Sequence, residues 1–280
     1  MELTTTAGAL PVFVLVCIAL TVILSIIVPI TFYLYLKHSG PVKRRPVLIG
    51  MAVFFCSAMV LERLLHILVL NIDTPVSRFL TRGGVINALC YGLYGAFAAG
   101  IFEETGRYLA YKTLLKEENG RRIPLLYGIG HGGFEAFLLC TLPMIANFVT
   151  AASLRRRGME EFLSVYTPEE ADVLRESFTQ FYTTPATAYL LAGVERILAF
   201  AIHVSLSVLV YVAIKNRKAR LMFPYAIFLH AVVDFVPALY QAGLIDSILI
   251  VELYTGIGAL ALTFLARVLY KKNLMNLPEI

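Results

Sequence analysis

The sequence predicts an all-α membrane protein, a polytopic bundle of about seven transmembrane helices. Hydrophobic residues make up 59% of the 280-residue chain and charged residues only 15%, whereas charged residues form about a quarter of an average soluble domain. The apolar residues also gather in blocks that reach the roughly 20 residues a helix needs to cross a bilayer. We expect helices because the hydrocarbon core offers no water to backbone groups.

We expect one integral membrane domain over residues 1–280, in which short linkers separate most of the spans. Residues 151–185 form the one sizeable linker, which is expected on the extracytoplasmic side. The predicted spans are residues 9–37, 46–72, 85–112, 123–150, 186–214, 220–241 and 244–269.

The first span is predicted to be retained and not removed as a signal peptide. Its N-terminal flank, Met1-Glu2-Leu3, contains no basic residue, and its apolar run is about twice the length of a signal-peptide core. The last two spans are the least clearly divided, because only Gln241, Ala242 and Gly243 lie between them.

The long linker contains a helix start. Thr167 is followed by Pro168 and two acids, which is typical of a helix N-terminus. Apolar residues follow at helical spacing from Ala171 to Phe181. A short amphipathic helix on the outer membrane surface and a solvated linker with one helical turn both fit this pattern.

The basic residues predict the orientation of the chain. Most of them lie in the linkers after spans 1, 3 and 5 and in the C-terminal tail, and fewer lie on the opposite side, among them Arg155, Arg156 and Arg157. The positive-inside rule then puts the N-terminus outside and the C-terminus in the cytoplasm. The net charge of +5 follows this distribution, so we expect no nucleic-acid partner.

Ionisable residues in spans 3 to 6 fall at one depth. Counted from the basic linkers at 1.5 Å per residue, they lie about 12–21 Å from the cytoplasmic ends. Such residues are costly within a membrane and usually face the bundle interior or a water-filled cavity. These residues are Glu103, Glu104, His131, Glu135, His203, His230 and Asp234.

Helical spacing groups these residues further. Arg107 follows Glu103 by four residues and Glu104 by three, so its guanidinium can reach a carboxylate. His131 shares a helix face with Glu135, as does His230 with Asp234. Glycine and alanine form a stripe in span 3, and glycines flank His131, so these helices can be approached closely.

A second polar set lies nearer the outer face, and we expect structural ion pairs there. His66 is interpreted as a satisfied core histidine. The set contains Glu62, Arg63, His66, Glu195, Arg196 and Glu252.

The deeper set has the groups that peptide hydrolysis needs. A carboxylate beside a second carboxylate suits a general base for water, while imidazoles can stabilise an oxyanion or protonate the leaving amine. The same set suits a Zn²⁺ ion, although no compact zinc signature is present. The residues fit two mechanisms, one in which a metal ion activates the water and one in which glutamate alone does so. The candidate metal ligands are His131, His203, His230 and Glu103.

Four motifs together resemble the YhfC family of candidate intramembrane proteases, which is related to PrsW and to the CAAX-protease (CPBP or Abi) superfamily. They are Phe102-Glu-Glu-Thr-Gly-Arg107, Gly130-His-Gly-Gly-Phe-Glu135, His203, and His230-Ala-Val-Val-Asp234. The resemblance covers most of the chain, from span 2 to span 7.

This resemblance implies a role for each matching residue. Glu103 would activate water, with Glu104 and Arg107 supporting it. His230 and Asp234 would stabilise the oxyanion, with His203 as a further polar member. The middle catalytic residue is either His131 or Glu135. The chain departs from the usual pattern in a shorter Glu103–Arg107 motif, in Tyr127 where Phe is typical and in Asp234 where prenyl-protein proteases have Asn.

These observations predict an intramembrane endopeptidase in the cell membrane, which would cleave a peptide or a membrane protein and contact lipid. One alternative is an ion-coupled transporter, because buried acids and imidazoles also form proton relays. The other is a non-catalytic immunity or assembly factor, because a fold does not fix a function.

Overall fold

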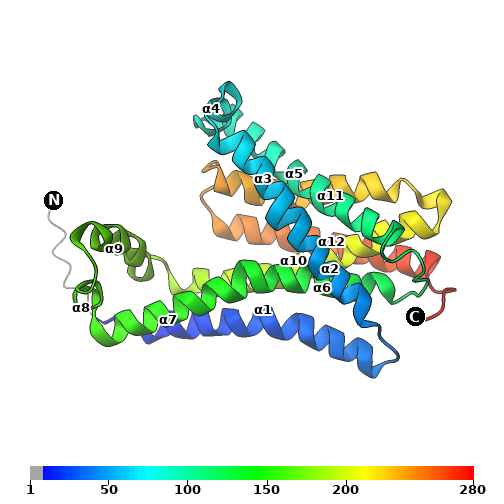
Figure 1. The fold of residues 1–280 in the computed structure, drawn as a ribbon, viewed down its shortest axis with the longest axis horizontal. Coiled ribbons are helices and arrows are strands. Elements are labelled where there is room, and N and C mark those ends of the chain that lie inside the picture. The colour runs from blue at the N-terminus through cyan, green and yellow to red at the C-terminus, as the bar shows by residue number, and fades with distance from the viewer. Residues whose placement is uncertain (1–8) are drawn as a thin grey trace. The chain divides into compact units, whose positions relative to one another are not determined.

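The computed structural model describes residues 9–280, and within this range the chain is all-helical, with no strand. Figure 1 shows the helices in chain order from blue to red. They are α1 (Val12–His38), α2 (Arg44–Phe54), η1 (Phe55–Glu62), α3 (Arg63–His66), η2 (Ile67–Asn71), α4 (Pro75–Thr81), α5 (Val85–Lys112), α6 (Ile123–Ala136), η3 (Phe137–Thr141), α7 (Leu142–Arg157), α8 (Met159–Leu163), α9 (Pro168–Thr183), α10 (Ala186–Lys215), η4 (Arg217–Ala219), α11 (Met222–Gln241) and α12 (Ile248–Asn273).

Seven helical stretches among the described residues are long and apolar enough to cross a membrane, which confirms the predicted fold class. Many large apolar side chains on them are exposed, as in a protein whose outer surface faces lipid. On α12, for example, Ile257, Leu260 and Phe264 are about 70% exposed and repeat at helical spacing. The stretches are Val12–His38, Arg44–Asn71, Val85–Lys112, Ile123–Arg157, Ala186–Lys215, Arg217–Gln241 and Ile248–Asn273.

The fourth stretch is longer than the predicted span of residues 123–150, because helix continues to Arg157 into the expected linker. Arg155, Arg156 and Arg157 occupy its last turn. Cations are favourable at this end of a helix, where the unpaired carbonyls carry partial negative charge. Gly158, with φ 82°, then ends the helix.

The predicted helix start at Thr167 is confirmed. Thr167 and Glu170 form a capping box, in which each side chain accepts a hydrogen bond from the other residue's backbone N–H. The resulting helix α9 has 16 residues, so the segment is more than a linker with one helical turn.

The described chain contains two compact units, and the prediction of a single domain stays a prediction. One unit comprises residues up to Ile27 together with Phe137–Arg196. Within it, Leu10 and Ile18 pack with Leu154 and Phe181, and Thr21 Oγ1 donates to the carbonyl of Tyr189 at 2.5 Å.

The second unit comprises Val28–Ala136 and Ile197–Ile280 and contains every residue of the candidate site. In this unit α5 packs along α11, and α2 packs along α6 (Figure 1). Its largest buried cluster surrounds three tyrosines, Tyr111, Tyr127 and Tyr211.

Glycines set the distance between α6 and its neighbours in this unit. A Cβ atom on Gly130 would lie 2.0 Å from the carbonyl oxygen of Val47 in α2. One on Gly128 would lie 2.7 Å from Val204 Cα in α10, and one on Gly132 would lie 3.0 Å from His203 Cβ. Gly128 and Gly132 share a face because they are four residues apart, and Gly130 lies on the opposite face. The glycine run therefore lets α6 contact α2 and α10 at backbone distance.

Gly130→Ala is expected to lower the free energy of unfolding by roughly 1–3 kcal/mol, because the added methyl group must push α2 away from α6. Gly95→Ala is the matched control, since its Cβ would lie 3.9 Å from the nearest atom, the Cβ of Ala238. The measurement is the thermal unfolding of the purified protein. Equal melting temperatures for the two variants would contradict the packing argument.

Candidate active site

All eight residues that the sequence singled out lie in the second unit and form one connected set. Seven of them are buried, and Asp234 is the exception, with 40% of its side chain exposed. Four helices contribute: Glu103, Glu104 and Arg107 lie on α5, His131 and Glu135 on α6, His203 on α10, and His230 and Asp234 on α11.

Small residues bring these four helices together at the level of the site. Gly132 faces His203 across the contact of α6 with α10. Gly100, one turn before Glu103 and Glu104, faces α11, where a Cβ would lie 2.7 Å from the carbonyl oxygen of Ile227 and 3.5 Å from His230 Cβ. A larger side chain at either glycine would separate the helices that present the imidazoles and acids.

Glu104 and Arg107 form an ion pair that is completely buried. Arg107 Nη1 donates to both carboxylate oxygens of Glu104, and neither side chain has any solvent exposure. Arg107 Nη2 donates to His203 Nδ1 at 3.2 Å, so that nitrogen acts as an acceptor, since a guanidinium can only donate. Arg107 therefore binds one acid and fixes the tautomer of one histidine.

Glu103 points into a different environment, which consists of imidazoles. Its Oε2 atom lies 2.7 Å from His131 Nε2 and 3.7 Å from His203 Nδ1. His131 is fully buried, and its other nitrogen, Nδ1, has no hydrogen-bond partner among the described residues. The two adjacent acids of the motif thus differ in their partners: Glu104 pairs with a cation and Glu103 with histidine rings.

Two histidines are each held by a carboxylate on one ring nitrogen. His203 Nε2 lies 2.5 Å from Glu135 Oε2, and it carries the proton because Nδ1 accepts from Arg107. His230 lies between two acids, with Nδ1 2.8 Å from Glu104 Oε1 and Nε2 3.2 Å from Asp234 Oδ2. Of the two residues left open for the middle position, His131 contacts Glu103 directly, whereas Glu135 contacts His203.

The donor set fits a divalent metal ion. Glu103, His203 and His230 are buried, and each offers one ligand atom within 4.8 Å of the others. Two histidines and one glutamate are the protein ligands of several catalytic zinc sites. Metal-bound histidines usually donate their second N–H to a carboxylate, as Glu135 and Glu104 would accept here. His131, which we included among the candidate ligands, lies outside this three-residue group.

Aromatic rings pack against the site, and of these the sequence motifs indicated Tyr127 but not Phe54. The ring of Phe54 in α2 meets the ring of His131 edge-on at 5.3 Å, and Tyr127 lies roughly parallel to it at 6.0 Å. Arg107 Cζ lies 5.9 Å from the centre of the Tyr127 ring. Phe54 sits in a uniformly apolar segment, so no local pattern distinguished it from a lipid-facing residue.

Part of the second polar set is paired, as expected. His66 Nδ1 lies 2.8 Å from the Tyr94 hydroxyl and Nε2 lies 3.2 Å from Glu62, so this histidine is satisfied. Arg196 pairs with the neighbouring Glu195.

Comparisons with known proteins agree with this site. The chain is 33% identical to an uncharacterized membrane protein, YhfC, from Bacillus subtilis (strain 168), over 87% of this chain and 92% of that protein. No solved structure matches the chain. The family model described as YhfC intramembrane metalloprotease matches residues 24–255, which include every member of the site. The chain therefore belongs to the YhfC family, and it is a multi-pass integral membrane protein.

Proposed function

We propose that this protein is an intramembrane endopeptidase that hydrolyses a peptide bond of a membrane-associated substrate. The family description supports a protease at the level of the family. The proposal rests on the different interaction partners of two adjacent acids. Arg107 forms an ion pair with Glu104, whereas Glu103 contacts imidazole rings within a membrane span.

The different partners of Glu103 and Glu104 support Glu103 as the general base. A carboxylate held by a guanidinium stays ionised and is a poor proton acceptor, whereas one that faces only imidazoles in a desolvated site can take up a proton. In the proposed reaction, Glu103 removes a proton from water while the water oxygen attacks the carbonyl carbon of the substrate. The proton later reaches the leaving amine as the C–N bond breaks.

The histidines have separate proposed roles. His131, 2.7 Å from Glu103, orients the base and shares its proton. His230 is held by Glu104 at Nδ1, and its Nε2 would donate to the oxyanion in place of its contact with the part-exposed Asp234. Glu135 and Arg107 act through His203 and are proposed as positioning residues.

Glu103, His203 and His230 are also the residues that would hold a metal ion. A bound Zn²⁺ would lower the pKa of water and polarise the substrate carbonyl. In that case Glu103 would serve as a metal ligand and not as the free base. Glu104 and Glu135 would orient the two histidines, and His131 would be the imidazole beside Glu103.

The substrate is proposed to be a peptide segment in or next to the membrane. Glu103, Glu104 and Arg107 lie within the membrane-crossing helix α5, about one to three turns from its end at Lys112. Asp234 is the most exposed member of the site, and we propose that the substrate enters the site on the side of Asp234.

Glu103→Gln is expected to reduce peptide cleavage by about 10²–10⁴-fold, because the amide keeps the shape of the side chain but cannot accept the proton. The assay uses purified protein in proteoliposomes with a library of fluorogenic transmembrane peptides. Glu195→Gln, which changes a membrane carboxylate outside the site, is the control and should retain activity. Wild-type cleavage by Glu103→Gln would end the proposal.

Arg107→Met is expected to lower the free energy of unfolding by about 3–5 kcal/mol, because it leaves Glu104 charged and buried without a cation. The double variant Arg107→Met/Glu104→Gln should recover much of this loss in thermal unfolding. Arg175→Met, which breaks the exposed pair with Glu160, should change stability little. Additive effects of the two site substitutions would show that the pair is not coupled.

Elemental analysis of the purified protein is expected to find about one divalent metal ion per chain. His203→Ala and His230→Ala should lose the ion, and His131→Ala and His66→Ala should keep it, because only the first two belong to the three-residue group. Metal retained by His230→Ala would refute this ligand set. Cleavage by a metal-free wild-type protein would show that glutamate activates the water without a metal ion.

A further inference from the structure

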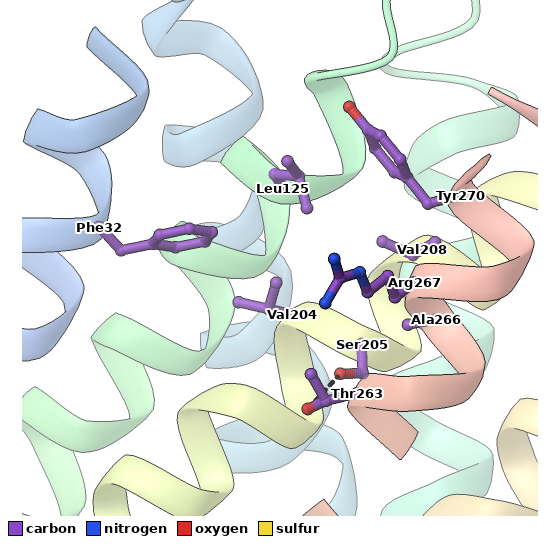
Figure 2. A pocket seen from close by; sticks show the side chains of 9 residues that line it. All are labelled: Phe32, Leu125, Val204, Ser205, Val208, Thr263, Ala266, Arg267 and Tyr270. Carbon is purple, nitrogen blue, oxygen red and sulfur yellow. Dashed lines mark hydrogen bonds between the residues drawn. The ribbon is translucent and has the colours of Figure 1, made fainter. Parts of the chain in front are cut away.

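A groove on the second unit is separate from the candidate active site. It has a volume of about 290 Å³ and lies between helices α1, α6, α10 and α12 (Figure 2). Its lining residues are Phe32, Leu125, Val204, Ser205, Val208, Thr263, Ala266, Arg267 and Tyr270.

Most of this lining is apolar, and the hydroxyls of Ser205 and Thr263 already have partners. Ser205 donates to the carbonyl of Ala201 at 2.7 Å, and its hydroxyl lies 3.4 Å from that of Thr263. Val204, Val208 and Ala266 provide aliphatic surface. The groove therefore suits an apolar occupant.

Arg267 is the single charged residue of the lining. Its guanidinium extends into the groove in Figure 2, and it makes no ion pair or hydrogen bond with any described residue. Arg267 lies six residues before the end of α12 at Asn273, about 9 Å along the helix axis. A cation this close to the end of a membrane helix lies near the depth of the lipid headgroups.

We propose that this groove binds an anionic phospholipid. Its phosphate accepts hydrogen bonds from Arg267, and one acyl chain lies along Val204, Val208 and Ala266. The lining supplies a positive charge with no carboxylate to balance it, which complements a phosphate. The apolar lining beside that charge gives the acyl chain a place that a free phosphate cannot use.

The site lies on a different face of α10 from the proposed catalytic residues. His203 points to Glu103 and Glu135, while Val204, Ser205 and Val208 face the groove. Residues on a helix turn by about 100° each, so Ser205 lies nearly opposite His203. The lipid site is therefore independent of the proposed proteolysis.

The test is native mass spectrometry of the full-length protein in detergent, titrated with phosphatidylglycerol or with phosphatidylcholine of the same acyl chains. We expect tighter binding of phosphatidylglycerol. Arg267→Gln should weaken it about fivefold, the factor for one basic residue near a membrane surface. Lys271→Gln removes an exposed charge one turn later on α12, outside the groove, and should leave binding unchanged.

Thr263→Phe is a second variant, at an exposed position, and its ring should fill the groove and weaken binding of both lipids. Three results would overturn the proposal: equal binding of the two lipids, equal losses in Arg267→Gln and Lys271→Gln, or full competition by glycerol phosphate. The last result would identify a site for a free anion.

Discussion

Arg107 and Glu104 form an ion pair inside a membrane span, and neither side chain has any solvent exposure. Separated charges at this depth would each face a large desolvation penalty, so the pair is stable only while both members are present. No arginine or lysine among the described residues pairs with Glu103, although that acid directly precedes Glu104 in the chain. Glu103 is instead hydrogen-bonded to His131 and lies next to the ring of His203, and this difference separates the supporting acid from the proposed base.

Close helix packing makes this arrangement possible. Gly130 lets α6 approach α2, while Gly128 and Gly132 let it approach α10, and Gly100 lets α5 approach α11. The imidazole- and carboxylate-bearing helices thus pack closely in two pairs, α6 with α10 and α5 with α11. The opposite face of α10 has a different character, because it lines an apolar groove with one cation, Arg267, that pairs with no described residue. One helix therefore separates a polar interior from a lipid-like surface.

Much of the fold and of the site could be predicted from the sequence, because membrane burial constrains composition strongly. Seven apolar stretches were recognisable, and charged residues within them stood out from an apolar background. All eight site residues lie together in the structure. The helix end at Arg157 was missed, because a cluster of arginines resembles a linker when the helix dipole is not considered. Phe54 was missed because an apolar residue in an apolar span carries no distinguishing pattern.

The sequence by itself determined the number of spanning helices, the placement of the acids and histidines within them, and their sharing of helix faces. It left open which acid Arg107 pairs with, since Glu103 and Glu104 are both within its reach along the helix. It also did not distinguish His131 from Glu135 as the middle catalytic residue. Only the tertiary structure decided these points, because α10 and α11 bring His203 and His230 to the site from about 70 to 130 residues further along the chain. Local spacing is fixed by the geometry of one helix, whereas partner choice depends on how separate helices pack.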